Sequence, residues 1–142
     1  MKGAYGFSVP ADSAIKLLDD LRQKVSALSA MVFLFPDMNT VQLVLVPTTD
    51  YAEAVIAFDT PEGQSMDCYE LVRWLKTLEK EQPFEITHLA PDLLRARFLT
   101  EIKEPLQLAK RIEKICSDVV NEPIEKVARH LATSHELYLW WD

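Results

Sequence analysis

Residues 84–98, with the sequence FEITHLAPDLLRARF, contain two short runs in which apolar and polar side chains alternate. Alternation with a period of two is typical of β-strands, and Ala90-Pro91-Asp92 between the runs is typical of a turn. An antiparallel pairing brings opposite charges together on the polar face of the resulting hairpin. The pairs that this hairpin predicts are Phe84 with Phe98, Glu85 with Arg97, Ile86 with Ala96, and His88 with Leu94.

The last seven residues, Glu136–Asp142 with the sequence ELYLWWD, alternate in the same way and predict a further strand. A chain end usually frays, so we expect one of the two tryptophans to fasten this strand to the core. The alternation places Trp141 on one face with the two leucines, and Trp140 on the other face with Tyr138. It leaves open which tryptophan is buried.

Residues 30–35 and 41–46 predict a second hairpin, because both runs are apolar or β-branched and Pro36–Thr40 between them is typical of a turn. Strands that are apolar on both faces need cover on both sides of the sheet. We therefore expect the first helix of the chain to pack on the face opposite to that of the later helices.

Five segments have apolar residues at helical spacing or a helix-start signal. Asp67 and Glu70 have the spacing of a capping box in front of the third of them. The predicted helices are residues 13–28, 51–58 and 67–81, one that opens at Glu104-Pro105, and one that opens at Asn121-Glu122-Pro123.

From residue 41 onward, the predicted order is strand, helix, strand, strand, helix pair and strand. This order is typical of an α+β fold with a ferredoxin-like split βαβ core, whose sheet is mostly antiparallel. The earlier segments add an N-terminal helix and a hairpin strand. Neither a linker nor an internal repeat interrupts the sequence, so we expect residues 1–142 to form a single domain.

Composition favours some function classes over others. The formal net charge is -7, which repels phosphate backbones and anionic lipids, so binding to nucleic acid or to membranes is disfavoured. The first residues contain no apolar run of the kind that a secretory signal has, and we expect a cytoplasmic protein. Cys68 and Cys116 lack metal-ligand spacing, and we expect both to be small, buried thiols.

Several segments together resemble a bacterial family catalogued as domain of unknown function 4253. The most distinctive are the terminal Trp140-Trp141-Asp142 and the Cys116–Val120 segment, supported by Asp50–Ala54, Trp74-Leu75 and Ile124–Ala128. The resemblance covers about the last two thirds of the chain and implies one compact bacterial domain. It implies no catalytic residues, because none are established for that family.

Motifs for chemistry are missing from the sequence. The three histidines lack the spacing of a zinc site, the serines lack a nucleophile elbow, and three glycines make no phosphate-binding loop. We therefore expect no metal, no cofactor and no catalytic residues. An alternative hypothesis is a small-ligand-binding or hydrolytic enzyme that uses Asp118 and a histidine.

Arginine and aromatic residues are predicted to share one face of the sheet, and the candidates are Arg95, Arg97, Tyr138 and Trp140. Such residues are enriched in protein-binding hot spots. The leading hypothesis is a non-catalytic module, of adaptor or immunity type, that binds an unidentified protein partner through this face. Two other interpretations stay open: a second small core beneath the first helix, and RNA binding on the sheet. The oligomeric state is not predicted.

Overall fold

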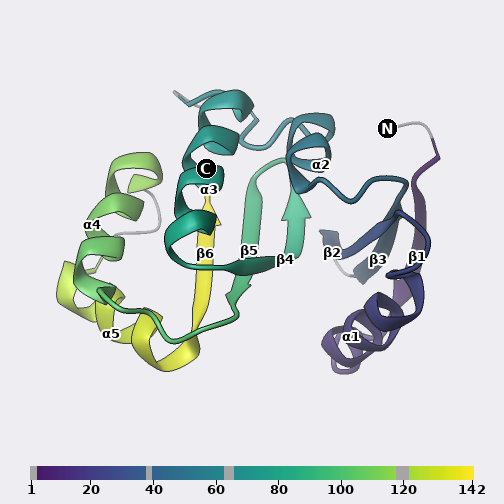
Figure 1. Cartoon of the computed structure of the whole chain (residues 1–142), viewed down its shortest axis with the longest axis horizontal. Coiled ribbons are helices and arrows are strands. Elements are labelled where there is room, and N and C mark those ends of the chain that lie inside the picture. The colour runs from purple at the N-terminus through teal and green to yellow at the C-terminus, as the bar shows by residue number, and fades with distance from the viewer. Residues whose placement is uncertain (1–2, 38–39, 63–65, 118–121) are drawn as a thin grey trace.

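The structure, a computed structural model, describes residues 3–37, 40–62, 66–117 and 122–142 (Figure 1). These residues form one six-stranded sheet and five helices. In chain order the elements are β1 (Tyr5–Val9), α1 (Ala14–Val25), β2 (Met31–Asp37), β3 (Thr40–Val46), α2 (Tyr51–Ala57), α3 (Cys68–Glu81), β4 (Phe84–Ala90), β5 (Leu93–Phe98), α4 (Pro105–Ile115), α5 (Ile124–Ser134) and β6 (Glu136–Trp140).

The sheet is mixed, with the strand order β1-β3-β2-β4-β5-β6. Strands β2 and β4 run parallel at its centre, and the other neighbouring pairs are antiparallel. The prediction of a mostly antiparallel sheet missed this parallel pair. The ferredoxin-like split is not confirmed, because β6 pairs with β5, the strand that precedes it in the chain. The coarser prediction, a mixture of helices with one sheet, is confirmed.

Strand β1 was not predicted from the sequence. It forms one edge of the sheet by pairing with β3, and Phe7 lies opposite Leu43. Most of its residues are exposed, Tyr5 and Phe7 included. In its sequence, YGFSV, the larger apolar residues alternate with glycine and serine, so the sequence did contain a strand signal, although the strand itself is little buried.

Two cores lie on opposite faces of the sheet. The larger core contains residues of α2, α3, α4 and α5 packed on one face of the sheet. The smaller core contains Leu18 and Val25 of α1 packed on Val32, Leu34 and Leu43 of β2 and β3. In Figure 1, α1 accordingly lies at the lower right, away from the other helices. The prediction that the first helix covers the opposite face is confirmed.

The helix predictions hold with one correction, except that Asn121 of the last predicted helix start lies outside the described residues. The capping box of α3 is present: Asp67 Oδ1 accepts from the Glu70 N–H, and the Glu70 carboxylate accepts from the Asp67 N–H. Helix α1 ends at Val25, whereas the sequence predicted an end near Leu28. Leu28 belongs to the turn that follows and its side chain is 66% exposed, so it does not extend the buried stripe. Cys68 and Cys116 are both buried, as predicted.

The hairpin of β4 and β5 has the predicted register at its first three pairs, including Glu85 with Arg97. A β-bulge then shifts the register between Ile86 and His88. As a result His88 lies opposite Arg95, and the predicted pairing of His88 with Leu94 is wrong. The extra residue of a bulge changes the face to which later side chains point, and alternation alone does not reveal it.

The chain end is fastened by Trp141. Its side chain is 4% exposed within the larger core, and its indole Nε1 donates to the Ile115 carbonyl at 3.2 Å. Trp140 points the other way and is partly exposed. Burial of a large aromatic ring with its one donor satisfied is a strong anchor. The structure thus answers which tryptophan is buried.

We expect Trp141→Ala to lower the free energy of unfolding by about 3–5 kcal/mol, because it opens a cavity in the larger core. Trp140→Ala is the matched control, and its cost should be about 1 kcal/mol because that ring leaves no cavity. Urea unfolding of the two variants measures the difference. Equal costs would show that Trp141 does not anchor the strand.

Candidate functional site

The sheet has one open face, on the same side as α1 but beyond the strands that α1 covers. Helix α1 packs on β2 and β3, so side chains of β4, β5 and β6 on this side remain partly exposed. They lie in cross-strand rows because of the registers of β4 with β5 and of β5 with β6. We define the open face by its eight residues: Glu85, His88, Leu93, Arg95, Arg97, Glu136, Tyr138 and Trp140.

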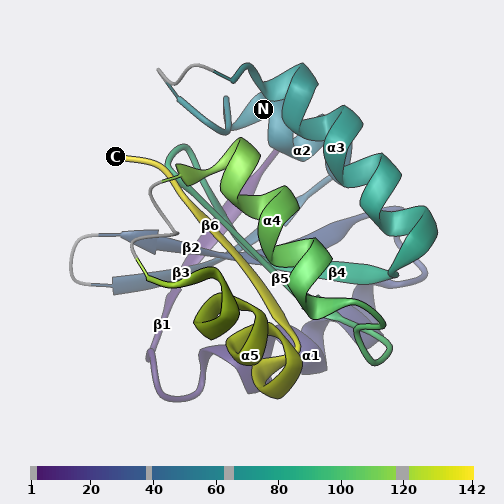
Figure 2. The same ribbon diagram turned by 90° about the vertical axis from the view of Figure 1, so that its left-hand side faces the viewer.

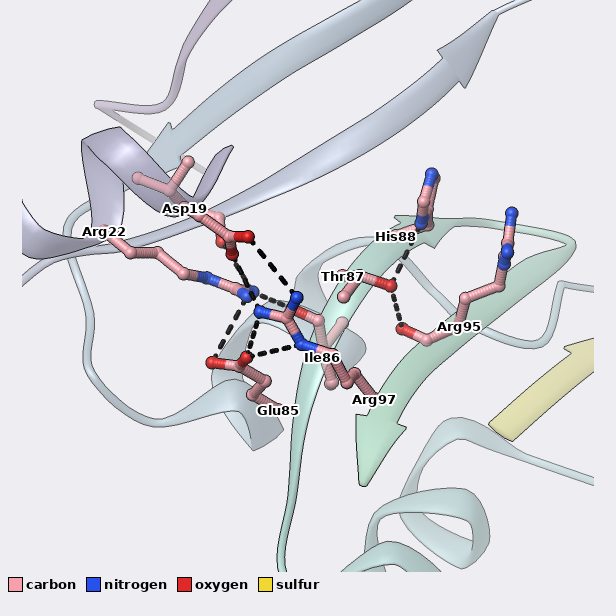
Figure 3. Close-up of polar contacts among 9 residues, drawn as sticks. Asp19, Arg22, Glu85, Ile86, Thr87, His88, Arg95 and Arg97 are labelled. Carbon is pink, nitrogen blue, oxygen red and sulfur yellow. Dashed lines mark hydrogen bonds and ion pairs between the residues drawn. The ribbon is translucent and has the colours of Figure 1, made fainter. Parts of the chain in front are cut away.

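A polar cluster joins α1 to this face (Figure 3). We define it by its four residues: Asp19 and Arg22 of α1, Glu85 of β4, and Arg97 of β5. Arg97 Nη2 lies 2.7 Å from Asp19 Oδ1, and Arg97 Nε donates to Glu85 Oε1 at 3.0 Å. Arg22 Nη1 lies 3.3 Å from Glu85 Oε2, within ion-pair distance although not aligned as a hydrogen bond. Two arginines and two carboxylates therefore balance each other.

Arg22 also connects the two parallel strands at the centre of the sheet. Its Nη2 donates to the Val32 carbonyl of β2 at 3.2 Å and to the Ile86 carbonyl of β4. Both carbonyls lie two residues before the point where Leu34 and His88 stand opposite each other. The guanidinium therefore satisfies strand acceptors that would be costly to leave without a donor inside the structure.

Electrostatics follow from this geometry. The hydrogen bond from Arg97 is the main cause that lowers the pKa of Asp19. The hydrogen bonds to Asp19 and Glu85 raise the pKa of Arg97. Burial lowers the pKa of Arg22, and the charge of Glu85 partly offsets that effect. Ion pairs of this kind, fixed at both ends by sheet and helix, hold α1 in one orientation.

The structure separates the two arginines that the sequence grouped together. Arg97 belongs to the polar cluster and is held at the margin of α1. Arg95 points toward β6, away from α1, and its Nη2 lies 2.7 Å from Glu136 Oε2. Its guanidinium also lies over the ring of Tyr138, 5.9 Å from the centroid. Tyr138 is 41% exposed, and Trp140 lies two residues further along β6 on the same face.

His88 completes the row with Arg95 and Tyr138. Its Nδ1 lies 3.0 Å from the Thr87 hydroxyl, which donates to the Arg95 carbonyl at 3.3 Å. Burial, reinforced by the positive charge of Arg95, lowers the pKa of His88 to about 4. The imidazole is therefore neutral at pH 7, and the row can both donate and accept hydrogen bonds.

Other residues that the sequence singled out are not among the eight that define the open face. Asp118, the residue of the enzyme hypothesis, lies outside the described residues. His130 is exposed on α5, and His135 follows that helix. Within the described ranges, no three histidine, cysteine or acidic residues are close enough to hold a metal ion. Nor does any described helix have the length and apolar character to cross a membrane.

Asp19 and Arg22 were missed as site residues. The available signal was their spacing of three residues beside the apolar stripe of α1, which places both on the side of the helix near the sheet. Charged residues beside a buried stripe usually face solvent, and their partners on β4 and β5 are far away in the sequence. Only the arrangement of α1 against the sheet reveals these partners.

A family model for a domain of unknown function (DUF4253) matches residues 42–142. The chain belongs to this family. The match begins within β3, so α1 and β2 precede the part that the DUF4253 model covers. The polar cluster joins Asp19 and Arg22 from the preceding part to Glu85 and Arg97 of the matched part. No curated protein and no solved structure matches the chain.

We expect Arg22→Met to lower the free energy of unfolding by about 2–4 kcal/mol. The carbonyls of the two central strands would lose a hydrogen-bond donor, and Glu85 would lose an ion-pair partner. Lys24→Met is the matched control, since Lys24 is an exposed cation two residues along the same helix. Urea unfolding compares the two variants. A loss no larger than that of the control would mean that Arg22 does not join α1 to the sheet.

The low pKa of His88 predicts a pH dependence of stability. In the unfolded chain a histidine takes up a proton near pH 6.5, whereas folded His88 does so only near pH 4. Stability should therefore fall as the pH decreases from about 6.5 to about 4, and His88→Gln should reduce this fall by about 1–2 kcal/mol, after allowance for solvent screening. Urea unfolding at pH 7 and pH 4.5 measures it, with His130→Gln as the surface control. An unchanged slope in His88→Gln would contradict the buried, neutral imidazole.

Proposed function

We propose that this DUF4253 domain is a non-catalytic protein-binding module, of adaptor or immunity type, and that the open face is its docking surface. The observation that carries the proposal is the row of His88, Arg95 and Tyr138, with Trp140 beside it, on a part of the sheet that α1 leaves uncovered. Sheet faces of compact domains are usually covered, and partly exposed arginine and aromatic side chains side by side suit a partner surface.

The chemistry of this row supports recognition of a protein. Tyr138 and Trp140 offer wide apolar rings that lose water readily, and Arg95 offers donors beyond the one that binds Glu136. His88 is neutral, so it adds no charge that burial against a partner would have to compensate. Leu93 lies opposite Trp140 and adds an apolar contact.

Arg97 has a supporting role in this proposal. Its guanidinium is engaged by Asp19 and Glu85, so few of its donors remain for a partner. By holding α1 at the margin, it keeps the helix from lying over Arg95 and Tyr138. The proposed contact residues are thus Arg95, Tyr138 and Trp140, and Arg97 positions the border of the surface.

The setting we propose is the bacterial cytoplasm. The wide separation of the two cysteines in the sequence and the burial of both fit a reducing compartment, and the family resemblance suggests a bacterial source. The net charge of -7 favours a basic protein partner over nucleic acid or an anionic membrane.

The enzyme alternative has one observation in its favour, the neutral imidazole of His88 beside the Thr87 hydroxyl. Thr87, however, is 6% exposed and donates its proton to a strand carbonyl, so a substrate could not reach it. A hydrolytic or small-ligand function that used Asp118 would need geometry outside the described residues.

Affinity capture tests the proposal. Tagged protein is incubated with lysate of the source cells at low salt, and bound proteins are identified by mass spectrometry. We expect the capture of a stoichiometric partner. The double variant Arg95→Ala with Trp140→Ala should bind that partner at least thirtyfold more weakly, since one hot-spot residue contributes about 2 kcal/mol.

The matched control is Tyr69→Ala with Arg73→Ala, an exposed aromatic and arginine pair on α3, on the other side of the sheet. This control should bind the partner as the unchanged protein does. The proposal would be overturned if the partner bound the variant Arg95→Ala with Trp140→Ala as tightly as the unchanged protein. It would also be overturned if no partner were captured and the protein had an activity that Asp118→Asn removes.

A further inference from the structure

The free edge of β6 offers a second element of recognition, which rests on the proposed function and specifies the partner. We propose that an extended, basic segment of the protein partner pairs with β6 and places a lysine or arginine side chain in the cavity beside it. Figure 2 views this edge, with β6 in yellow running between α4 and α5. Strand addition to an open sheet edge is a recurrent way to bind peptides.

The direction of the backbone groups of β6 follows from two hydrogen bonds at its ends. The Trp141 N–H donates to the Asp92 carbonyl at 3.0 Å, and the Phe98 N–H donates to the His135 carbonyl at 2.9 Å. In an antiparallel pair, alternate residues direct their N–H and C=O toward the neighbouring strand. The odd-numbered residues 135–141 therefore face β5, and those between them direct their backbone groups away from the sheet.

Among these outward residues, Tyr138 has a free peptide edge. The Glu136 N–H donates to Ser134 Oγ at 3.2 Å, and the Trp140 carbonyl accepts from the Cys116 thiol at 2.9 Å. For the Tyr138 N–H and C=O, the described residues provide no partner. One outward donor and one outward acceptor on the same residue are the groups that an added strand requires.

A cavity of about 280 Å³ lies against this part of β6. Its walls combine Tyr138, whose side chain belongs to the open face, with Ile112 and Leu131, which belong to the helix side. A hollow lined from both faces must open at the edge of the sheet. Its lining residues are Ile112, Glu122, Val127, His130, Leu131, Glu136 and Tyr138.

The charges of the lining select the occupant. Glu122 and Glu136 are its two carboxylates, and neither lysine nor arginine lines it. Two cations outside the lining each bind one of these carboxylates: Lys126 binds Glu122 Oε1, and Arg95 binds Glu136 Oε2. The second oxygen of each carboxylate can therefore accept a hydrogen bond from the occupant.

The apolar part of the lining suits the rest of a basic side chain. Ile112, Val127 and Leu131 can pack against its methylene groups, and the ring of Tyr138 can take its cation. A lysine or arginine is therefore the side chain that matches both the charge and the apolar wall. This agrees with the net charge of -7.

Peptide binding with amide exchange tests this. The probe is a seven-residue peptide of alternating threonine and valine with a central lysine and blocked ends. We expect the Tyr138 amide to exchange quickly in the free protein and at least tenfold more slowly with saturating peptide, as measured by NMR. The amides of Leu137 and Leu139, which face β5, should be slow in both states. The same peptide with a central glutamate should bind at least tenfold more weakly.

Two variants locate the interaction. Tyr138→Pro removes an outward N–H and the aromatic ring but no bond to β5, so β6 can still pair with β5, and it should abolish binding of the lysine peptide. Tyr138→Ala, which removes the ring and keeps the N–H, is the control and should weaken binding less. Glu122→Lys, at an exposed position, should reverse the preference toward the glutamate peptide.

The outcomes separate this proposal from the proposed function. The edge proposal is overturned if the lysine peptide leaves the Tyr138 amide unprotected from exchange. It is also overturned if the Glu122→Lys and Tyr138→Pro variants bind the lysine peptide as tightly as the unchanged protein does. Capture that depends on Arg95 and Trp140 would then still uphold the binding module. If the peptide binds as expected and the captured partner still binds the variant Arg95→Ala with Trp140→Ala, the edge is supported and the docking role of the open face fails.

Discussion

The guanidinium of Arg22 is the interaction on which the arrangement of this domain depends. The sheet consists of two antiparallel halves, β1-β3-β2 and β4-β5-β6, which meet only where β2 runs parallel to β4. Arg22 bridges a carbonyl from each half and pairs with Glu85. Because its side chain is only 20% exposed, these interactions act in surroundings of low dielectric, where they are strong when complete and costly when broken. One residue thus fixes both the junction of β2 with β4, which we call the seam, and the position of α1.

The open face is a consequence of that seam. Helix α1 is held over β2 and β3 by its own core, and Asp19 and Arg22 mark the limit of its contact with the second half of the sheet. Arg97 of β5 binds Asp19 at this limit. Beyond it, Arg95 has a separate partner, Glu136, and neighbours Tyr138. The same residue type therefore joins helix α1 to the sheet at one position and pairs with the neighbouring strand β6 two residues earlier.

Sequence patterns predicted the parts of the fold that rest on local signals. The capping box at Asp67, the hairpin of β2 and β3, and the pairing of Glu85 with Arg97 each follow from residues close together in the chain. Strand β1 was missed although its sequence, YGFSV, alternates apolar and polar residues. Two further features were missed for lack of a local signal: the bulge before His88 has no compositional mark, and the parallel seam needs α1 to bring in Arg22. For the candidate site, alternation grouped Tyr138 with Trp140 on one side of β6 but did not decide which side is exposed. It also did not reveal that Arg95 and Arg97 bind different partners.

The family match places the seam in a wider context. It begins at residue 42, inside β3, and β3 and β4 are not neighbours in the sheet, because β2 lies between them. Residues 42–142 alone would leave a strand of each half without its partner, and two open edges inside a sheet are unstable in water. In this chain β2, which precedes the match, lies between the two halves and closes both edges. Helix α1 comes from the same preceding part, so the extent of the open face is set by residues that the family model does not cover.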